Sequence, residues 1–327
     1  MARAGAVTPR MDDFFVCDFQ NVAPKHDLAS MEHPLFSLAT RPDRRILSYR
    51  HNDVEMTVTP SVRGRATIFD ADILIYCISQ LMAALNAGRP VDRRLTLVAH
   101  DLLLATGRET SGDSYRRLRE AFERLVGTRI TTNIVTGSEE VTQGFGLIEA
   151  WEIVRKTRQG RMVSVSVTLS DWLYQAVLNR NVLTLSRDYF RMRKPLERRI
   201  YEIARKHCGR QRLWRVSLEV LLKKSGSTSP LRVFRAMVRD MRRSDGLPDY
   251  RLEEEPGDII VVTPRGALIE PAEGLQLAPD TLEAARALVP GADIYALEAE
   301  WRAFAAARPA PRDANSAFLG WIRKRTG

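Results

Sequence analysis

The chain has 327 residues, of which 44% are apolar and 28% charged, with a formal net charge of +10. This length and composition predict a soluble globular protein of two or three domains and exclude disorder as the default. No apolar run is long enough to span a membrane, and MARAGAVTPR at the start lacks a signal-peptide core, so we expect a cytoplasmic protein. Cys17, Cys77 and Cys208 lie far apart, which favours buried thiols in a reducing compartment and offers no zinc-binding set.

The positive charge is concentrated in one segment. Residues 187–243 contain 18 Lys and Arg against 5 Asp and Glu, whereas residues 244–300 contain 3 against 13. This segregation predicts one localised site for a polyanion. A solvated basic face without a partner is the alternative.

The N-terminal half is expected to hold an arm and a first domain. The arm, residues 1–60, covers the first domain, which spans residues 61–186. A helix at 71–86 opens this domain, with Asp70 as its expected N-cap and Phe69 as a hydrophobic staple. The later elements are a strand at 95–98, helices at 101–105 and 113–126, wing strands at 129–135 and 162–169, and an extended segment at 147–154.

A second domain over residues 187–265 is expected to repeat this order. Pro195 suits the first turn of its opening helix, because the N–H that proline lacks is unsatisfied there. The later elements are a strand at 213–216, helices at 218–224 and from Pro230 with Ser229 as N-cap, and hairpin strands at 250–255 and 258–262. Residues 266–327 are expected to form a linker and a small helical region.

Two segments, 97–125 and 216–241, share one layout: a strand-like pair, a short helix, a Gly/Ser-rich turn and a longer amphipathic helix. An offset of 119 residues pairs apolar positions that we expect in the cores: Tyr115 with Phe234, Leu118 with Met237, and Phe122 with Met241. This is the helix-turn-helix layout, whose second helix enters the DNA major groove. The expected fold class is α+β, with two tandem winged-helix domains and a small helical C-terminal region.

The long helix of the second copy separates into an apolar arc and a basic arc at about 100° per residue. The basic arc consists of Arg232, Arg235, Arg239, Arg242 and Arg243. These guanidinium groups repel one another unless a polyanion neutralises them, and arginine binds guanine and phosphate through paired hydrogen bonds. We therefore predict that this helix contacts double-stranded DNA, with a solvated charged face as the alternative. Further candidate contacts are Lys223, Lys224, Arg116 and Arg198.

The first copy carries carboxylates where the second carries arginines. At the same offset, Asp113, Glu120 and Glu123 align with Arg232, Arg239 and Arg242. Phosphates repel carboxylates, so we predict that the first domain contacts protein or binds DNA weakly, and that the second is the main reader. The acidic wing at 253–255 also argues against insertion of this wing into the minor groove.

Catalytic and cofactor motifs are missing from the sequence. It contains no G-x-x-x-x-G-K-[ST] phosphate loop, and its five histidines form no H-x-H pair for a nicking enzyme. Asp70 and Asp72 resemble the carboxylate pair of a primase metal site, but a helix start also favours Asp through capping and the helix dipole. We therefore expect no enzymatic activity, no cofactor and no metal.

Long motifs resemble one known family. These are DFFVCDFQNVAPKHDLASMEHPLFSL at 13–38, VEMTVTPSVRGRATIFDADILIYC at 54–77 and LSRDYFRMRKPLERRIYEIARKHCG at 185–209. They are similar to the plasmid replication initiator protein A family. The resemblance implies tandem winged-helix domains that bind repeated origin sites (iterons), open the adjacent duplex and bring in the host initiator and replicative helicase. It also implies that the first domain dimerises and that the second makes the main base contacts.

Two further interpretations remain at this stage. A winged-helix transcriptional regulator, including one that represses its own promoter, would have the same sequence features. In the C-terminal region, Trp301, Phe304, Phe318 and Trp321 lie in a segment that we expect to be too short to bury them all. Because large aromatic residues anchor protein interfaces, this region is predicted to bind a replication partner. The alternative is a helical flap packed onto the second domain.

Overall fold

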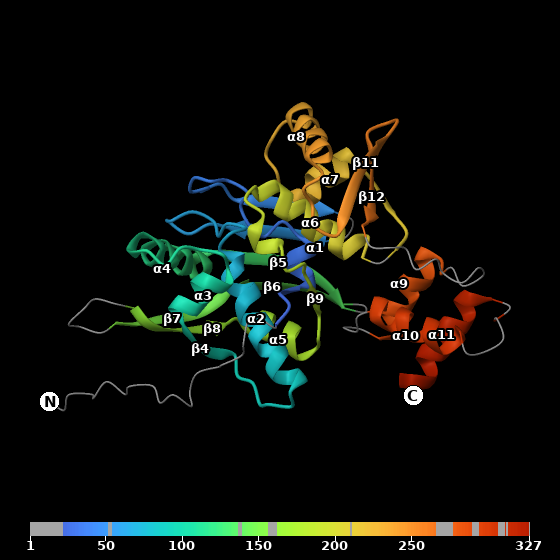
Figure 1. The fold of residues 1–327 in the computed structure, drawn as a ribbon, viewed down its shortest axis with the longest axis horizontal. Helices are drawn as coiled ribbons and strands as arrows, with labels where there is room; N and C mark the ends of the chain where they lie inside the picture. The colour runs from blue at the N-terminus through green and yellow to red at the C-terminus, as the bar shows by residue number, and fades with distance from the viewer. Residues whose placement is uncertain are drawn as a thin grey trace.

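The computed structural model describes residues 22–51, 54–136, 139–155, 162–209, 211–265, 277–289, 294–306, 311 and 313–326. The protein is of the α+β class, with two units of mixed helix and strand and a group of three helices at the C-terminal end (Figure 1). The first 21 residues of the expected arm, which include Cys17, lie outside the described residues, as does most of the expected linker. Cys77 and Cys208 are buried free thiols, as predicted.

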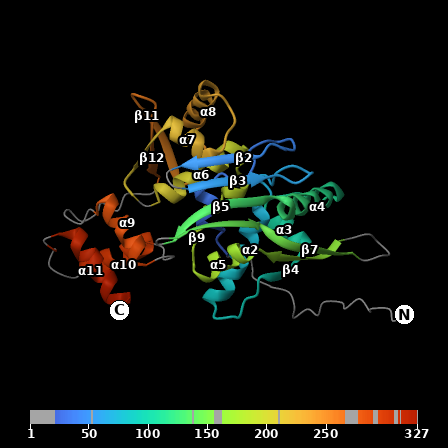
Figure 2. The same cartoon turned by 180° about the vertical axis from the view of Figure 1, so that it is seen from behind.

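The N-terminal arm contacts both units. Its strand β1, Lys25–Asp27, pairs antiparallel with β9, Val182–Thr184. Helix α1, Leu28–Glu32, then packs on α6 of the second unit. Strands β2, Leu47–His51, and β3, Val54–Thr59, form a hairpin at the edge of the larger sheet (Figure 2). The arm therefore joins the two units.

The first unit is built around a helix that is buried along most of its length, α2. Its elements are α2 Ala71–Asn86, β4 Arg94–Val98, α3 Ala99–Ala105, α4 Gly112–Gly127, β5 Arg129–Thr136, β6 Glu139–Gly146, β7 Ile148–Arg155, β8 Met162–Leu169 and α5 Asp171–Leu178. They form a three-stranded sheet of order β4-β8-β7, while β5 and β6 join the arm in a sheet of order β2-β3-β5-β6. Of the segments expected as wing strands, 162–169 forms β8 and pairs with β7, which covers the expected extended segment, whereas 129–135 lies in β5 and pairs with β3 and β6 in the other sheet.

The second unit has the same order of helix, strand, helix, helix and hairpin, without counterparts of β5, β6 and α5. Its elements are the 3-10 helix η2 Tyr189–Arg191, α6 Pro195–His207, β10 Trp214–Ser217, α7 Leu218–Ser225, α8 Leu231–Ser244, β11 Tyr250–Glu255 and β12 Ile259–Pro264. The sheet order β10-β12-β11 matches β4-β8-β7 in the first unit. In each unit the strand after the first helix pairs with the last strand of the hairpin. The two sequence segments with a shared layout therefore have a shared topology.

Local sequence signals fix the ends of α6 and α7, whereas α8 begins after Pro230 and is not capped by a side chain, so Ser229 is not its N-cap. The Ser217 hydroxyl caps α7 by accepting the Val220 N–H, and Pro195 begins α6 as predicted. Gly226 ends α7 with a φ of 68°, and a Cβ there would lie 2.5 Å from the Cβ of Pro34 in the arm. Glycine is therefore required both by the left-handed backbone and by the close approach of the arm.

Three apolar clusters form the cores. The first centres on α2 and its two sheets, and the second on α6, α7, α8 and the β11–β12 hairpin. Met31 of α1 and Ile75 of α2 belong to the second cluster, so the two units pack against each other. The third cluster lies among α9 Pro279–Leu288, α10 Ile294–Ala306 and α11 Ala314–Thr326.

The C-terminal helices bury more of their aromatic residues than the sequence led us to expect. Trp301 and Phe318 are enclosed in the third cluster, with ring centroids 5.4 Å apart. Phe304 remains 42% exposed, beside Trp321 at 6.2 Å between ring centroids. Three short helices therefore supply enough apolar surface for a small core of their own.

Candidate nucleic-acid interface

Helix α8 directs its arginines away from the core of the second unit. Phe234, Val238 and Met241 are buried, with a spacing that places them on one side of the helix. Of the five predicted arginines, Arg235 is half-buried, and the exposed ones are Arg232, Arg239, Arg242 and Arg243. The helix lies at the outer edge of the unit, at the top of Figure 1. A large part of its surface is thus open to a ligand.

The β11–β12 hairpin neutralises several of these arginines. Arg235 donates two hydrogen bonds to Asp258, at 2.6 and 2.8 Å, and Arg239 donates to both carboxylate oxygens of Glu254, at 2.7 and 2.9 Å. Arg242 lies 3.7 Å from the same Glu254. Hydrogen bonds from these arginines hold the pKa values of Glu254 and Asp258 below their ordinary range. The acidic hairpin therefore binds part of the basic surface of α8 when no DNA is present.

Two predicted cations remain without such a partner. The ion pairs of α8 involve its other four arginines, and within the described ranges none reaches Arg232. Lys223, exposed near the end of α7, likewise forms no ion pair with a described residue. Arg232 lies in the first turn of α8, where a recognition helix commonly contacts base edges.

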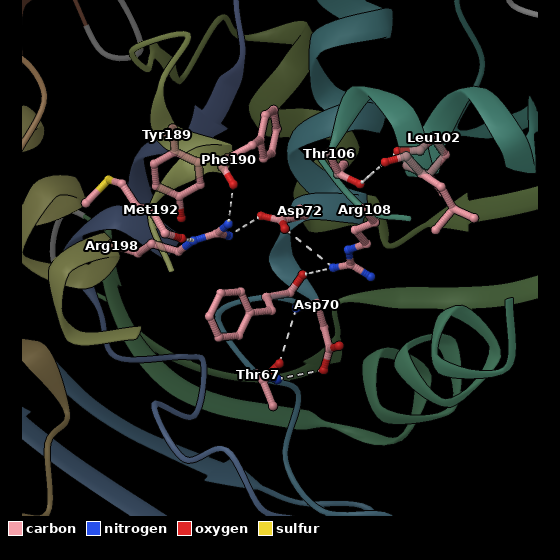
Figure 3. Close-up of polar contacts among 12 residues, drawn as sticks. Thr67, Asp70, Asp72, Leu102, Thr106, Arg108, Tyr189, Phe190, Met192 and Arg198 are labelled. Carbon is pink, nitrogen blue, oxygen red and sulfur yellow. Dashed lines mark hydrogen bonds and ion pairs between the residues drawn. The ribbon is translucent and has the colours of Figure 1, made fainter. Parts of the chain in front are cut away.

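The prediction that Arg198 contacts DNA is corrected, because its side chain lies in the interior. Arg198 is 2% exposed and its Nη1 lies 2.6 Å from Asp72 Oδ1 on α2. The guanidinium also donates to the backbone carbonyl oxygens of Met192 and Phe190, at 2.8 and 3.2 Å. Figure 3 shows Asp72 between Arg198 and Arg108, which approaches from the opposite side at 3.4 Å. Arg198 thus joins the second unit to the first.

Lys224 is also withdrawn from the predicted interface. Its side chain is 5% exposed and forms an ion pair with Glu32 of α1. Lys206 lies 2.5 Å and His207 3.0 Å from the same carboxylate. Burial alone raises the pKa of Glu32, but the His207 hydrogen bond and the charges of Lys206 and Lys224 outweigh it and hold the pKa well below its ordinary range. The cluster fixes the arm to the second unit.

The structural register of the two long helices differs from the predicted offset of 119. Buried residues on α4 and α8 match at an offset of 116: Leu118 with Phe234, Phe122 with Val238, and Leu125 with Met241. Met237, which the sequence alignment placed in the core, is 44% exposed. Both offsets place apolar residues on apolar residues, so the pattern alone could not separate them.

The corrected register changes the comparison of charges. The equivalent positions are Arg116 with Arg232, Arg119 with Arg235, and Glu123 with Arg239. Asp113 and Glu120 are therefore not the equivalents of Arg232 and Arg239, as the offset of 119 had indicated. They act locally instead, because Asp113, Glu120 and Glu123 form ion pairs along α4 with Arg116, Arg117 and Arg119. The cations of α4 are thus largely neutralised on their own helix.

The carboxylates of Asp70 and Asp72 serve separate arginines. Asp70 accepts hydrogen bonds from Arg124 at 2.7 and 2.8 Å and from the Thr67 N–H at 2.8 Å, and its side chain does not cap α2. Asp72 pairs with Arg198 and Arg108. In the part of the chain that the structure describes, no group of three His, Cys, Asp or Glu side chains is arranged to hold a metal ion.

The arm also gives the protein a predicted sensitivity to acid. Burial lowers the pKa of His33 to about 4, with Lys206, Arg199 and Lys224 adding to the effect and Glu32 opposing it. Between about pH 6.5 and 4 the unfolded chain therefore binds a proton that the folded protein does not. As the pH falls through this window, stability should decrease by about 3 kcal/mol.

Urea unfolding midpoints at several pH values check this expectation. The variant His33→Gln should lose part of the pH dependence above pH 5, and the remainder is expected from His207, whose pKa is also lowered by burial. If the unfolding midpoint changed equally with pH in wild type and variant, a group other than His33 would be responsible for the loss of stability in acid.

Comparison with known proteins places the chain in a family. Residues 25–252 match the family "Replication initiator protein A". A curated relative from Wigglesworthia glossinidia brevipalpis, named "Putative replication protein", is 38% identical over 247 residues, which cover 74% of this chain and 90% of the relative.

One solved structure shares the fold at low sequence identity. A crystal structure of domains 2 and 3 of RctB has a TM-score of 0.50 at 15% identity, and the likeness covers 71% of this chain and 94% of that one. A second crystal structure of RctB domains 2–3 has a TM-score of 0.47 at 15% identity, covering 71% and 95%. The family and the curated relative place the protein in the class of replication initiators. The chain belongs to the replication initiator protein A family, so the resemblance found in its sequence is confirmed.

Proposed function

We propose that the protein initiates plasmid replication by binding repeated origin sequences through two winged-helix domains, with α8 as the main reader. The order helix, strand, helix, helix and hairpin supports the winged-helix assignment, because both units contain it with the same strand order, the first with β5 and β6 inserted before its hairpin. A domain of this kind places its third helix in the major groove. Origin opening and recruitment of the host initiator and helicase complete the proposed role.

One observation carries the proposal: α8 is an exposed helix with five arginines, at the position of a recognition helix. Its ion pairs to the hairpin are accessible to solvent, and pairs of this kind contribute only about 0–1 kcal/mol each. Phosphates and guanine bases can therefore displace the carboxylates at small cost. The acidic hairpin in turn is better suited to hold arginines than to enter the minor groove.

For the first unit we propose dimerisation and at most auxiliary contact with DNA. Its helix α4 carries four arginines against three carboxylates, and three of those arginines form ion pairs along the helix itself. Arg116 is one of these paired residues, so its contribution to DNA binding should be small. A self-association measurement on the intact chain, with and without substitutions on α4, tests the dimer.

The C-terminal helices are the proposed contact for a host replication protein. Phe304 and Trp321 present aromatic surface there, with the Arg325 guanidinium 5.2 Å from the Trp321 ring centroid. Of the helices that the structure describes, none combines the length and apolar character needed to cross a membrane. We assign no catalytic step, cofactor or metal to the proposed function.

An origin-dependence test addresses the function directly. A plasmid that carries the cognate repeats should replicate only when the protein is supplied. Protein that represses a promoter but supports no replication would favour the transcriptional regulator. Substituting Phe304 and Trp321 with alanine should impair replication while leaving affinity for the repeats unchanged, if these residues contact a host protein.

Substitutions of Arg232 and Lys223, which form no ion pair with a described residue, should distinguish sequence-specific binding from general DNA binding. Arg232→Ala should weaken binding to the cognate repeat by ~1–3 kcal/mol and to random DNA much less, if the guanidinium contacts a base. Lys223→Ala should weaken binding to all sequences and reduce the salt slope by about 0.9 if one phosphate contact is lost. Arg116→Ala is the matched control on α4 and should have little effect. Titrations at several salt concentrations measure all three, and an unchanged slope for Lys223→Ala would contradict its assignment.

A further inference from the structure

Helix α8 exposes apolar residues beside its arginines. Val233 is 39% and Met237 44% exposed, and Ala236 is also exposed. These residues are spaced by three and four positions, so they lie next to one another along the helix surface. The helix meets its own core through other residues, Phe234, Val238 and Met241. Val233, Ala236 and Met237, called here the apolar stripe, are therefore not needed to form the core of the second unit.

The apolar stripe lies on the surface that α8 would present to a major groove. Arg232 precedes Ala236 by four residues, and Arg239 follows it by three, so both are neighbours of the stripe. The acidic hairpin holds Arg235 and Arg239, whereas Arg232 forms no ion pair with a described residue and stays available beside the stripe. Apolar and cationic groups thus share one accessible face.

Major-groove chemistry supplies a ligand for this combination. The C5 methyl group of thymine is the apolar group on base-pair edges there, and guanine offers two acceptors that match arginine. We infer that Val233, Ala236 and Met237 recognise thymine methyl groups next to a guanine contacted by Arg232. The inference rests on the proposed function, because it assumes that α8 lies in the groove, and it specifies which base edges the helix reads.

A protein partner is less compatible with the same surface. Stable interfaces bury about 800 Å² on each side and involve roughly 20–30 residues. The stripe has three apolar residues, and the helix that carries them has five arginines against one aspartate. A duplex neutralises those charges and presents isolated methyl groups of matching size. The charge and the small apolar area therefore both favour DNA.

The test is a methyl scan of the protected repeat. Each thymine is replaced in turn by deoxyuridine, which pairs identically but lacks the methyl group, and the affinity of the full chain is measured. Loss of one buried methyl should weaken binding about fourfold at one or two positions. At those positions Val233→Ala or Met237→Ala should bind thymine and uracil duplexes equally. Both residues are exposed, so the variants should fold normally.

Leu104→Ala provides the matched control, because Leu104 is an exposed apolar residue of α3 in the first unit and should not alter the discrimination. Equal binding of thymine and uracil duplexes by wild-type protein would overturn the inference while leaving DNA binding intact. Discrimination that persists unchanged in both alanine variants would overturn it too. If the variants instead lose self-association without any change in DNA affinity, the stripe is a protein contact and the inference fails. No binding to any duplex would refute the proposed function itself.

Discussion

Replacing Asp72 with alanine is expected to destabilise the protein by about 3–5 kcal/mol. The substitution leaves the Arg198 guanidinium, which is 2% exposed, without its carboxylate. The remaining hydrogen bonds of Arg198 go to two backbone carbonyl oxygens, which carry no full charge. An uncompensated charge in the interior costs far more than a lost ion pair in water. The expected loss is a large part of the stability of a typical domain.

Urea unfolding of the purified chain measures this loss. Arg94→Ala is the control, because Arg94 forms an exposed ion pair with Glu152 at 2.9 Å, and its loss should cost less than about 1 kcal/mol. The double variant Asp72→Ala/Arg198→Met removes both charges and should be more stable than Asp72→Ala alone. If the stability losses of the two single substitutions simply added in the double variant, the two side chains would not be coupled and the expectation would be refuted. If Asp72→Ala cannot be purified folded, recovery of the double variant still tests it.

The pair has a structural consequence beyond its energy. Asp72 belongs to α2 of the first unit and Arg198 to α6 of the second, and the guanidinium lies 4.5 Å from the Phe69 ring centroid and 5.0 Å from that of Tyr189. Burial raises the pKa of Asp72, and the charges of Arg198 and Arg108 oppose that effect. This network orients one unit relative to the other, and thus orients the two long helices that the proposed function requires.

The sequence predicted the positions of the helices and strands in both units better than it predicted how the strands pair and how the helices align. Apolar periodicity and residues that favour a helix start, such as Pro195 in α6, are local signals, so α2, α6 and the β11–β12 hairpin follow from a few adjacent residues. Strand pairing is not local, which is why the sequence did not indicate that β5 and β8, both expected as wing strands, lie in different sheets. The offset of 119 failed for a related reason, because Met237 is apolar yet exposed.

The candidate site shows the same limit. Composition identified the basic segment and the arginines of α8, but it could not show that Arg198 and Lys224 turn inward. Their partners, Asp72 and Glu32, lie 126 and 192 positions away in the chain. The one available hint was the carboxylate triplet at 253–255, which argued against insertion of the wing into the minor groove. The role of the wing carboxylates in holding arginines requires the three-dimensional register of the hairpin.

The double variant Arg235→Ala/Arg239→Ala should lose about 3 kcal/mol of affinity for the cognate repeat. Each guanidinium that binds a base through two hydrogen bonds contributes about 1–3 kcal/mol of discrimination, and leaving its carboxylate costs about 0–1 kcal/mol. The double variant should therefore bind the cognate repeat more weakly than the wild-type protein. Binding to random DNA should weaken much less, so the specificity ratio should fall. Competition titrations with cognate and random duplexes measure both quantities.

The wing carboxylates provide the converse experiment. Asp258→Asn and Glu254→Gln remove the charges that hold Arg235 and Arg239, so DNA no longer has to displace them. We expect affinity to rise by up to about 1 kcal/mol for each substitution, with a steeper salt dependence, because negative charge beside the phosphates is also removed. Arg302→Ala is the control, since Arg302 pairs with Glu298 on α10, outside the proposed interface, and should change nothing. If both neutral variants bind more weakly than wild type, the carboxylates orient the arginines for base contact and do not compete with DNA for them.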